Sequence, residues 1–203
     1  MKKGNWLVLA RTKFMLNDLE DTLYSQGLYY QNKFKTNREQ DLYTAVNDWE
    51  NLRKGVDINY DQISRISSYM SEKNFEKNCL KYMDKDARHT MQSLRERMWL
   101  KTNDVWYNAF DNAPQKKVRY IRRMRENGEK LNSAPRITLS TIHGVKGGEQ
   151  DNVVLLTDLS RNTQRNYEKN PDDENRLFYV GATRTKNHLH IIRPKDIYKG
   201  YKI

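Results

Sequence analysis

Residues 137–157 read ITLSTIHGVKGGEQDNVVLLT, two short β-branched runs around a loop that contains three glycines. The runs, 137–142 and 153–157, are apolar and bounded by structure-breaking residues, so they predict buried strands. The polar side chains between them are Thr141, His143, Lys146 and Glu149. Ligands of open α/β sheets bind at the carboxyl ends of the strands, and glycine lets the backbone approach a ligand closely. This stretch therefore predicts a binding surface built on a rigid strand.

The chain is strongly basic. It has 203 residues, with 37 Lys and Arg against 26 Asp and Glu, which gives a net charge of +11. Charge for solubility alone does not need such a bias, so a polyanion is the expected partner, and nucleic acid is the first candidate.

Cysteine usage and hydropathy point to a reducing compartment. Cys79 is the single cysteine, so the chain has no internal disulfide. No apolar run approaches the roughly 20 residues that a membrane helix needs, and no signal peptide follows the basic start. We expect no membrane association and a cytoplasmic protein of bacterial or phage type.

Both ends of the chain have α/β character. Trp6–Ala10 predicts a buried strand, residues 14–26 a helix closed by Gly27, and residues 28–30 a short strand. Near the C-terminus, residues 158–170 predict a polar connection, residues 171–174 a helix start and residues 188–192 a last strand.

The middle of the chain has little glycine, dense charge and regularly spaced aromatic residues. Helices are predicted over residues 39–54, 62–70, 86–100 and 115–131. Residues 118–125 form the densest basic run, with Arg119, Arg122, Arg123 and Arg125 beside Lys116 and Lys117. Two readings of this run stay open, a solvated helix face and a face that contacts phosphates.

These patterns predict an α/β fold: a mostly parallel sheet flanked by helices, with an all-helical insertion. The outer pieces are each too small to close a core alone, so they are expected to fold together. The predicted parts are residues 1–36 and 134–203 for the α/β domain and 37–133 for the insertion.

Two strings support a family resemblance. Residues 141–149 read TIHGVKGGE and residues 174–186 read ENRLFYVGATRTK. Together with residues 6–30, these regions resemble motifs IV, V and VI of superfamily 1 DNA helicases of the UvrD/Rep/PcrA type. Gly144 stands where many members have Ser, and Gly148 where Leu is usual. The insertion lies where members carry their accessory 2B domain.

The resemblance implies the second of two RecA-like domains that sandwich ATP and share a track for single-stranded DNA. The P-loop string, GxxxxGK followed by Ser or Thr, does not occur in these residues. We therefore expect an N-terminal P-loop domain of the same protein to hold ATP and its Mg²⁺, and this chain to hold no metal and to be inactive alone.

The same resemblance assigns roles to individual residues. Arg11 and Arg184 match arginines that reach the γ-phosphate, where guanidinium forks neutralise the transferring phosphoryl group. Glu149, with Gly147 and Gly148, is placed at the nucleotide. Thr141, His143 and Lys146 are placed at the DNA backbone, where contacts position the strand without reading its sequence.

The predicted function is the C-terminal motor domain of an ATP-dependent DNA helicase or translocase, acting on single-stranded DNA or DNA junctions. The alternative is a non-catalytic nucleic-acid-binding module derived from such a motor. The lack of a P-loop fits both hypotheses.

Overall fold

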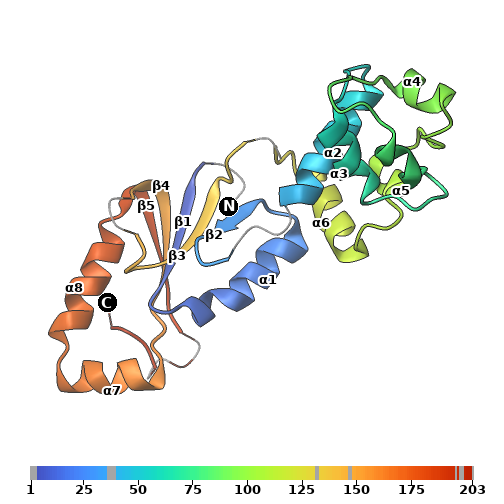
Figure 1. The fold of residues 1–203 in the computed structure, drawn as a ribbon. Coiled ribbons are helices and arrows are strands. Elements are labelled where there is room, and N and C mark those ends of the chain that lie inside the picture. The colour runs from blue at the N-terminus through green and yellow to red at the C-terminus, as the bar shows by residue number, and fades with distance from the viewer. Residues whose placement is uncertain are drawn as a thin grey trace. The chain divides into compact units, whose positions relative to one another are not determined.

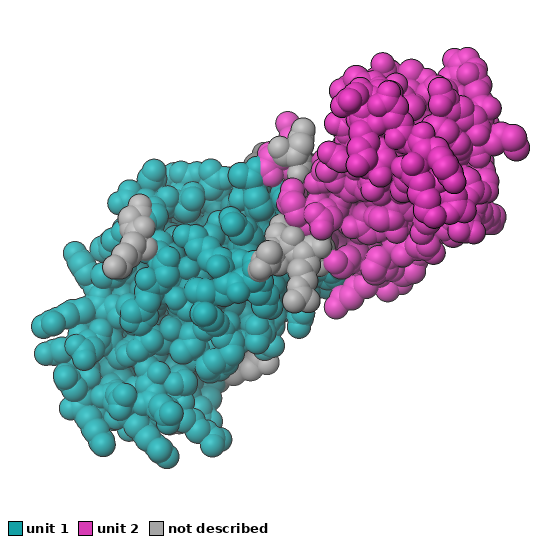
Figure 2. All heavy atoms as spheres, in the orientation of Figure 1, with its two compact units in different colours: residues 1–37, 134–203 teal, residues 38–133 magenta. Residues whose placement is uncertain are grey.

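The chain divides into two compact units. The computed structural model describes residues 4–35, 40–130, 133–145, 148–194, 196 and 199–202. Unit 1 combines residues 1–37 with 134–203, and unit 2 comprises residues 38–133 (Figure 2). The N-terminal and C-terminal α/β pieces thus fold together, although all of unit 2 lies between them in the sequence.

Unit 1 is built on a parallel sheet of five strands in the order β2-β3-β1-β4-β5. Their bounds are β1 Trp6–Ala10, β2 Tyr30–Asn32, β3 Ile137–Thr141, β4 Gln150–Leu156 and β5 Thr185–Ile192. The predicted α/β fold is confirmed, and the sheet that was expected to be mostly parallel is wholly parallel. The central strand β1 comes from the N-terminal piece and pairs with β3 and β4 from the C-terminal piece, which joins the two pieces into one core.

Alternation along β1 divides the core between the two faces of the sheet. Leu7 and Leu9 pack on one face with Val153 and Leu155, whereas Val8 and Ala10 pack on the other. Successive side chains of a strand point to opposite faces, so a strand covered on both faces has an uninterrupted apolar sequence. Figure 1 shows α1 against one face and α8 against the other.

The helices of unit 1 follow directly from the strands. They are η1 Lys13–Leu16, α1 Asn17–Gln26, α7 Arg161–Lys169 and α8 Asp172–Ala182. Gly27 ends α1 with a φ of 66°, the left-handed conformation that glycine adopts without cost, as predicted. The polar connection predicted over residues 158–170 is wrong, because Ser160 caps a helix there by accepting a hydrogen bond from the Thr163 amide.

Unit 2 is helical. Its elements are α2 Gln40–Arg53, α3 Tyr60–Ser67, η2 Lys77–Lys81, α4 Met91–Glu96, α5 Trp106–Ala109 and α6 Gln115–Glu126. Trp49 is fully buried, 6.0 Å from the ring of Phe110, and its indole nitrogen donates to the carbonyl of Asp104. The aromatic residues that recur through this region therefore form its core.

One predicted helix of unit 2 is much shorter than expected. Residues 86–100 contain only the helix Met91–Glu96. His89 pairs with Ile58 in an isolated bridge before this helix, and Met98 turns the chain after it with a φ of 58°. Leu100 then pairs with Phe75, so tertiary pairing overrides the helical pattern at both ends.

None of the helices in the described part of the chain is both long and apolar enough to cross a membrane.

Candidate functional site

The carboxyl ends of β1 and β3 carry the first group of predicted site residues. Arg11 follows β1, and His143 lies two residues beyond the end of β3. The Ile142 amide donates to the Ala10 carbonyl at 3.0 Å, so the two strand ends stay paired up to the loops that leave them. This pairing fixes where both loops start.

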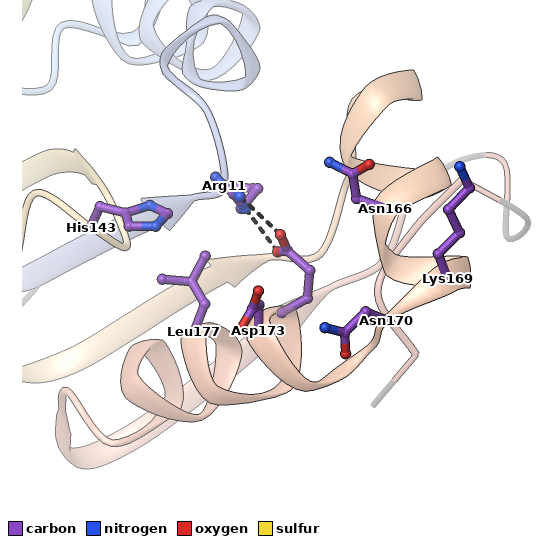
Figure 3. Close-up of a pocket in the computed structure, with 8 residues that line it drawn as sticks. Arg11, His143, Asn166, Lys169, Asn170, Asp173 and Leu177 are labelled. Carbon is purple, nitrogen blue, oxygen red and sulfur yellow. Dashed lines mark hydrogen bonds and ion pairs between the residues drawn. The ribbon is translucent and has the colours of Figure 1, made fainter.

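Arg11 forms a two-pronged ion pair with Glu174 in the first turn of α8. Its Nε lies 2.8 Å from Oε2 and its Nη2 2.8 Å from Oε1 (Figure 3). The Glu174 side chain is only 7% exposed and that of Arg11 is 23% exposed. Parallel bonds between guanidinium and carboxylate combine charge with fixed geometry. The pair therefore joins the end of β1 to the start of α8.

A polar pocket of about 550 Å³ opens at this edge. It is lined by Arg11, His143, Asn166, Lys169, Asn170, Asp173, Glu174 and Leu177. Figure 3 shows that the ion pair of Arg11 with Glu174 lies between His143 on one side and the α7 side chains Asn166 and Lys169 on the other. Of these eight residues, only Arg11 and His143 were predicted from the sequence to be site residues.

The residues that sequence reasoning missed come from α7 and from the first turn of α8. Glu174 lies 163 positions from Arg11, so no local pattern links the two side chains. Asn166 and Lys169 belong to a helix that was not predicted at all. The one available signal was the acidic start of α8, since carboxylates are favoured at a helix N-terminus.

The loop after β3 stays close to the strand that precedes it. Thr141 is nearly buried, and its hydroxyl accepts a hydrogen bond from the Gly144 amide at 3.2 Å. A Cβ at position 144 would lie 2.9 Å from the Ser140 hydroxyl and 3.3 Å from that of Thr141. Glycine therefore allows a turn that a larger residue would push away from the strand, and His143 is exposed on this turn.

Arg184 lies at the opposite, amino edge of the sheet. It follows α8 by two residues and directly precedes β5, and its carbonyl accepts from the Gln150 amide at 3.0 Å. Its Nε donates to the Val180 carbonyl at 3.0 Å, and its Nη2 lies 3.4 Å from the Thr183 hydroxyl. Only hydroxyl and carbonyl oxygens, and no carboxylate, are recorded as its hydrogen-bond partners among the described residues.

Glu149 belongs to the same edge as Arg184. It is exposed and directly precedes Gln150, the first residue of β4, which pairs with Thr185 of β5. Gly148 adjoins it, and a Cβ there would lie 3.2 Å from Val145. Lys146 and Gly147, also predicted at this loop, lie outside the described residues.

Arg11 and Arg184, which the family resemblance assigned to the same γ-phosphate, lie at opposite edges of the sheet. Trp6 pairs with Asn152 and Leu9 with Leu155, so Arg11 stands level with the carboxyl end of β4, whereas Arg184 stands at its amino end. At about 3.3 Å per residue, the length of β4 separates the two edges by roughly 20 Å. The structure thus groups Arg184 with Glu149, and Arg11 with Thr141 and His143.

The all-parallel sheet and the helices that flank it are those of a RecA-like class of domain. The family model of the UvrD-like helicase C-terminal domain matches residues 9–196. The chain belongs to this family and is a helicase motor domain. No curated protein matches it.

Proposed function

We propose that this chain supplies the second half of an ATP-dependent DNA motor, with its two ligands at opposite edges of the sheet of unit 1. Arg184 and Glu149 form the nucleotide edge. Thr141 and His143 form the DNA edge. The observation that carries the proposal is the separation of the predicted residues into these two groups by the strand register.

At the nucleotide edge, the proposal assigns the γ-phosphate contact to Arg184. Arg184 is only partly buried, and its guanidinium donates hydrogen bonds to uncharged oxygens, the Val180 carbonyl and the Thr183 hydroxyl. An anionic phosphate can replace these acceptors. A guanidinium fork matches the geometry of a phosphoryl group and stabilises its charge in the transition state. The exposed carboxylate of Glu149 suits the hydroxyl groups of a ribose. ATP and its Mg²⁺ are held by the P-loop domain in this proposal.

Arg11 was predicted to act as a second finger, and this role stays a prediction. The Arg11 guanidinium is already paired with the Glu174 carboxylate. Releasing Arg11 would leave the buried carboxylate of Glu174 without a partner. The proposal therefore gives Arg11 a positioning role at the DNA edge.

At the DNA edge, the exposed His143 is suited to a phosphate oxygen of a single strand, and the buried Thr141 hydroxyl holds the turn that presents it. Such contacts position the strand without reading its sequence. The net charge of +11 supports a polyanionic ligand.

The test is steady-state ATP hydrolysis by the full-length enzyme, with and without single-stranded DNA. Arg184→Ala should lower turnover by at least roughly 10³-fold, the lower end for arginine fingers, and leave DNA binding and melting temperature nearly unchanged. Arg184→Lys should restore little, because a point charge cannot replace a fork.

Arg176 provides the matched control. It is an exposed arginine of α8 on the same helix. Arg176→Ala should leave turnover close to that of the wild type. Unchanged turnover of a stable Arg184→Ala enzyme would contradict the finger role, and a full-length protein without hydrolysis would favour the non-catalytic module.

A further inference from the structure

The helical unit 2 carries a cationic surface on α6. One face of this helix is buried and consists of Val118, Tyr120, Ile121 and Met124. The other face exposes five cationic side chains, Lys116, Arg119, Arg122, Arg123 and Arg125. Lys116, Arg119, Arg122 and Arg125 follow one another at intervals of three residues and Arg123 adjoins Arg122, so the five charges cover about half of the helix surface and form a row of positive charge.

A cleft of about 350 Å³ opens beside this row. Its lining comes from α2, from α6 and from α5 with the residue that precedes it: Glu50, Arg53, Val105, Trp106, Tyr107, Arg122, Arg125 and Glu126. The Arg122 guanidinium lies over the Tyr107 ring at 4.4 Å, and the buried Trp106 meets that ring edge-on at 5.7 Å. The cleft therefore has an aromatic wall with a planar cation already stacked on it.

The ion pairs of the cleft leave it positively charged. Glu50 lies 3.6 Å from Arg53 and 3.8 Å from Arg125, and both arginines remain partly exposed. Three arginines face two glutamates in the lining, and the row on α6 adds further positive charge. A ligand that combines a flat apolar group with an anionic chain matches both features.

We propose that unit 2 binds single-stranded nucleic acid, with the phosphates along α6 and one unpaired base in the cleft against Tyr107 and Arg122. Aromatic rings and guanidinium planes are the surfaces on which unpaired bases stack, and a cationic groove holds the backbone. The inference rests on the proposed function only for the class of ligand, and it gives the insertion a binding site of its own.

The size of the cleft favours an unpaired base over a duplex. Its volume is near the lower end of the ~300–1,000 Å³ range of small-molecule sites, which suits one planar group. A base within a duplex has both faces stacked on its neighbours and offers none to Tyr107. An acidic protein segment would satisfy the arginines but would leave the aromatic wall without a matching partner.

The test measures binding of a labelled oligothymidine to the full chain by fluorescence anisotropy. Tyr107→Ala should weaken binding roughly 5- to 150-fold, the range for loss of one stacked base. Tyr107→Phe keeps the ring and should bind like the wild type. Arg122→Ala should weaken binding by removing a stacking plane and also lower its salt dependence, because one positive charge of the row on α6 is lost.

Two variants control for aromatic surface and for charge within the same unit. Tyr82 is 84% exposed and lies outside the cleft, so Tyr82→Ala should change nothing. Arg95 is an exposed arginine of α4, and Arg95→Ala should have much less effect than Arg122→Ala. Melting curves of each variant show whether the fold is retained.

Photocrosslinking of wild-type protein to bromouracil-containing single strands gives a readout that needs no variant. We expect adducts at Tyr107 or Trp106. Equal binding by Tyr107→Ala and wild type, tighter binding of a duplex of the same length, or equal displacement by polyglutamate would each overturn the inference.

The outcomes also separate this inference from the proposed function. If adducts map only to residues 141–145 and Tyr107→Ala binds normally, the inference fails and the motor proposal stands. If Tyr107-dependent binding is found but the full-length protein does not hydrolyse ATP, the inference stands and the motor proposal fails.

Discussion

Glu174→Ala removes the carboxylate that holds the fork of Arg11, and its cost can be reasoned from the contacts. Two charge-assisted hydrogen bonds of 2.8 Å are lost, and the Arg11 guanidinium is left largely buried. Breaking a buried pair by removing one partner costs about 3–5 kcal/mol, because the remaining charge is uncompensated. Arg11 is 23% exposed, so water in the adjoining pocket offsets part of this cost. We expect a loss of about 3 kcal/mol.

The assay is thermal and urea unfolding of the chain, followed by circular dichroism. One kcal/mol shifts the melting temperature of a domain of 60–100 residues by roughly 4–8 °C, so unit 1 should melt at least roughly 10 °C lower. Glu174→Gln keeps one acceptor and should cost less. A double-mutant cycle of Glu174→Ala with Arg11→Met isolates the coupling between the two side chains.

A surface pair in the same unit provides the comparison. Lys35 contacts Glu20 at 2.5 Å; its side chain is 57% exposed, whereas that of Glu20 is 12% exposed. An ion pair of an exposed lysine contributes about 0–1 kcal/mol, and Tyr30 and Asn32 still donate to Glu20, so Lys35→Met should shift the unfolding midpoint only slightly. If the coupling of Arg11 with Glu174 is no larger than the effect of Lys35→Met, the view that this pair fixes the start of α8 is refuted.

Further predictions concern the chain itself. The isolated chain should not hydrolyse ATP with or without DNA, and robust turnover by these 203 residues would contradict the proposed split motor. Binding of single strands should be independent of sequence and fall steeply with salt, with a logarithmic slope of about −0.7 for each phosphate neutralised, and a flat response in a salt titration would refute this. Burial, and secondarily Glu76, raises the pKa of the Cys79 thiol to about 11, so alkylation at pH 8, measured by mass spectrometry, should be far slower in the folded than in the unfolded chain. Burial, and secondarily Arg97, lowers the pKa of His89, so the unfolded chain binds a proton more readily. Stability should thus be steady above about pH 7 and fall as the pH drops below about 6.5; this decline in melting temperature should be weaker in His89→Gln.

The sheet could be predicted because its strands are buried on both faces. Trp6–Ala10 was predicted with its observed bounds, and β3 within one residue, since continuous apolar runs between breakers leave few alternatives. The helix α7 could not be predicted in this way, because it has no buried residue and Tyr167 is the one hydrophobic side chain among its nine residues. A capping serine was its one local signal.

The site could be predicted only as a set of residues, not as an arrangement. The resemblance to helicase motifs selected Arg11, His143, Glu149 and Arg184 as site residues. The motif sequences do not specify at which edge of the sheet each residue lies. The strand register decides that, and it depends on pairing between segments more than 120 residues apart in the sequence. The partner of Arg11 was missed for the same reason.

The helix α8 links the two edges that the register separates. Glu174 lies in its first turn and binds Arg11, and Arg184 lies two residues past its last residue. Its eleven residues span about 16 Å at 1.5 Å per residue, close to the length of β4. Phe178 in its middle and Gly181 near its end are buried against the sheet, where a Cβ at Gly181 would lie 3.1 Å from Leu155. A helix packed this closely has little room to shift against the sheet. Under the proposed function, α8 is therefore the element that joins the DNA edge, where Glu174 holds Arg11, to the nucleotide edge at Arg184.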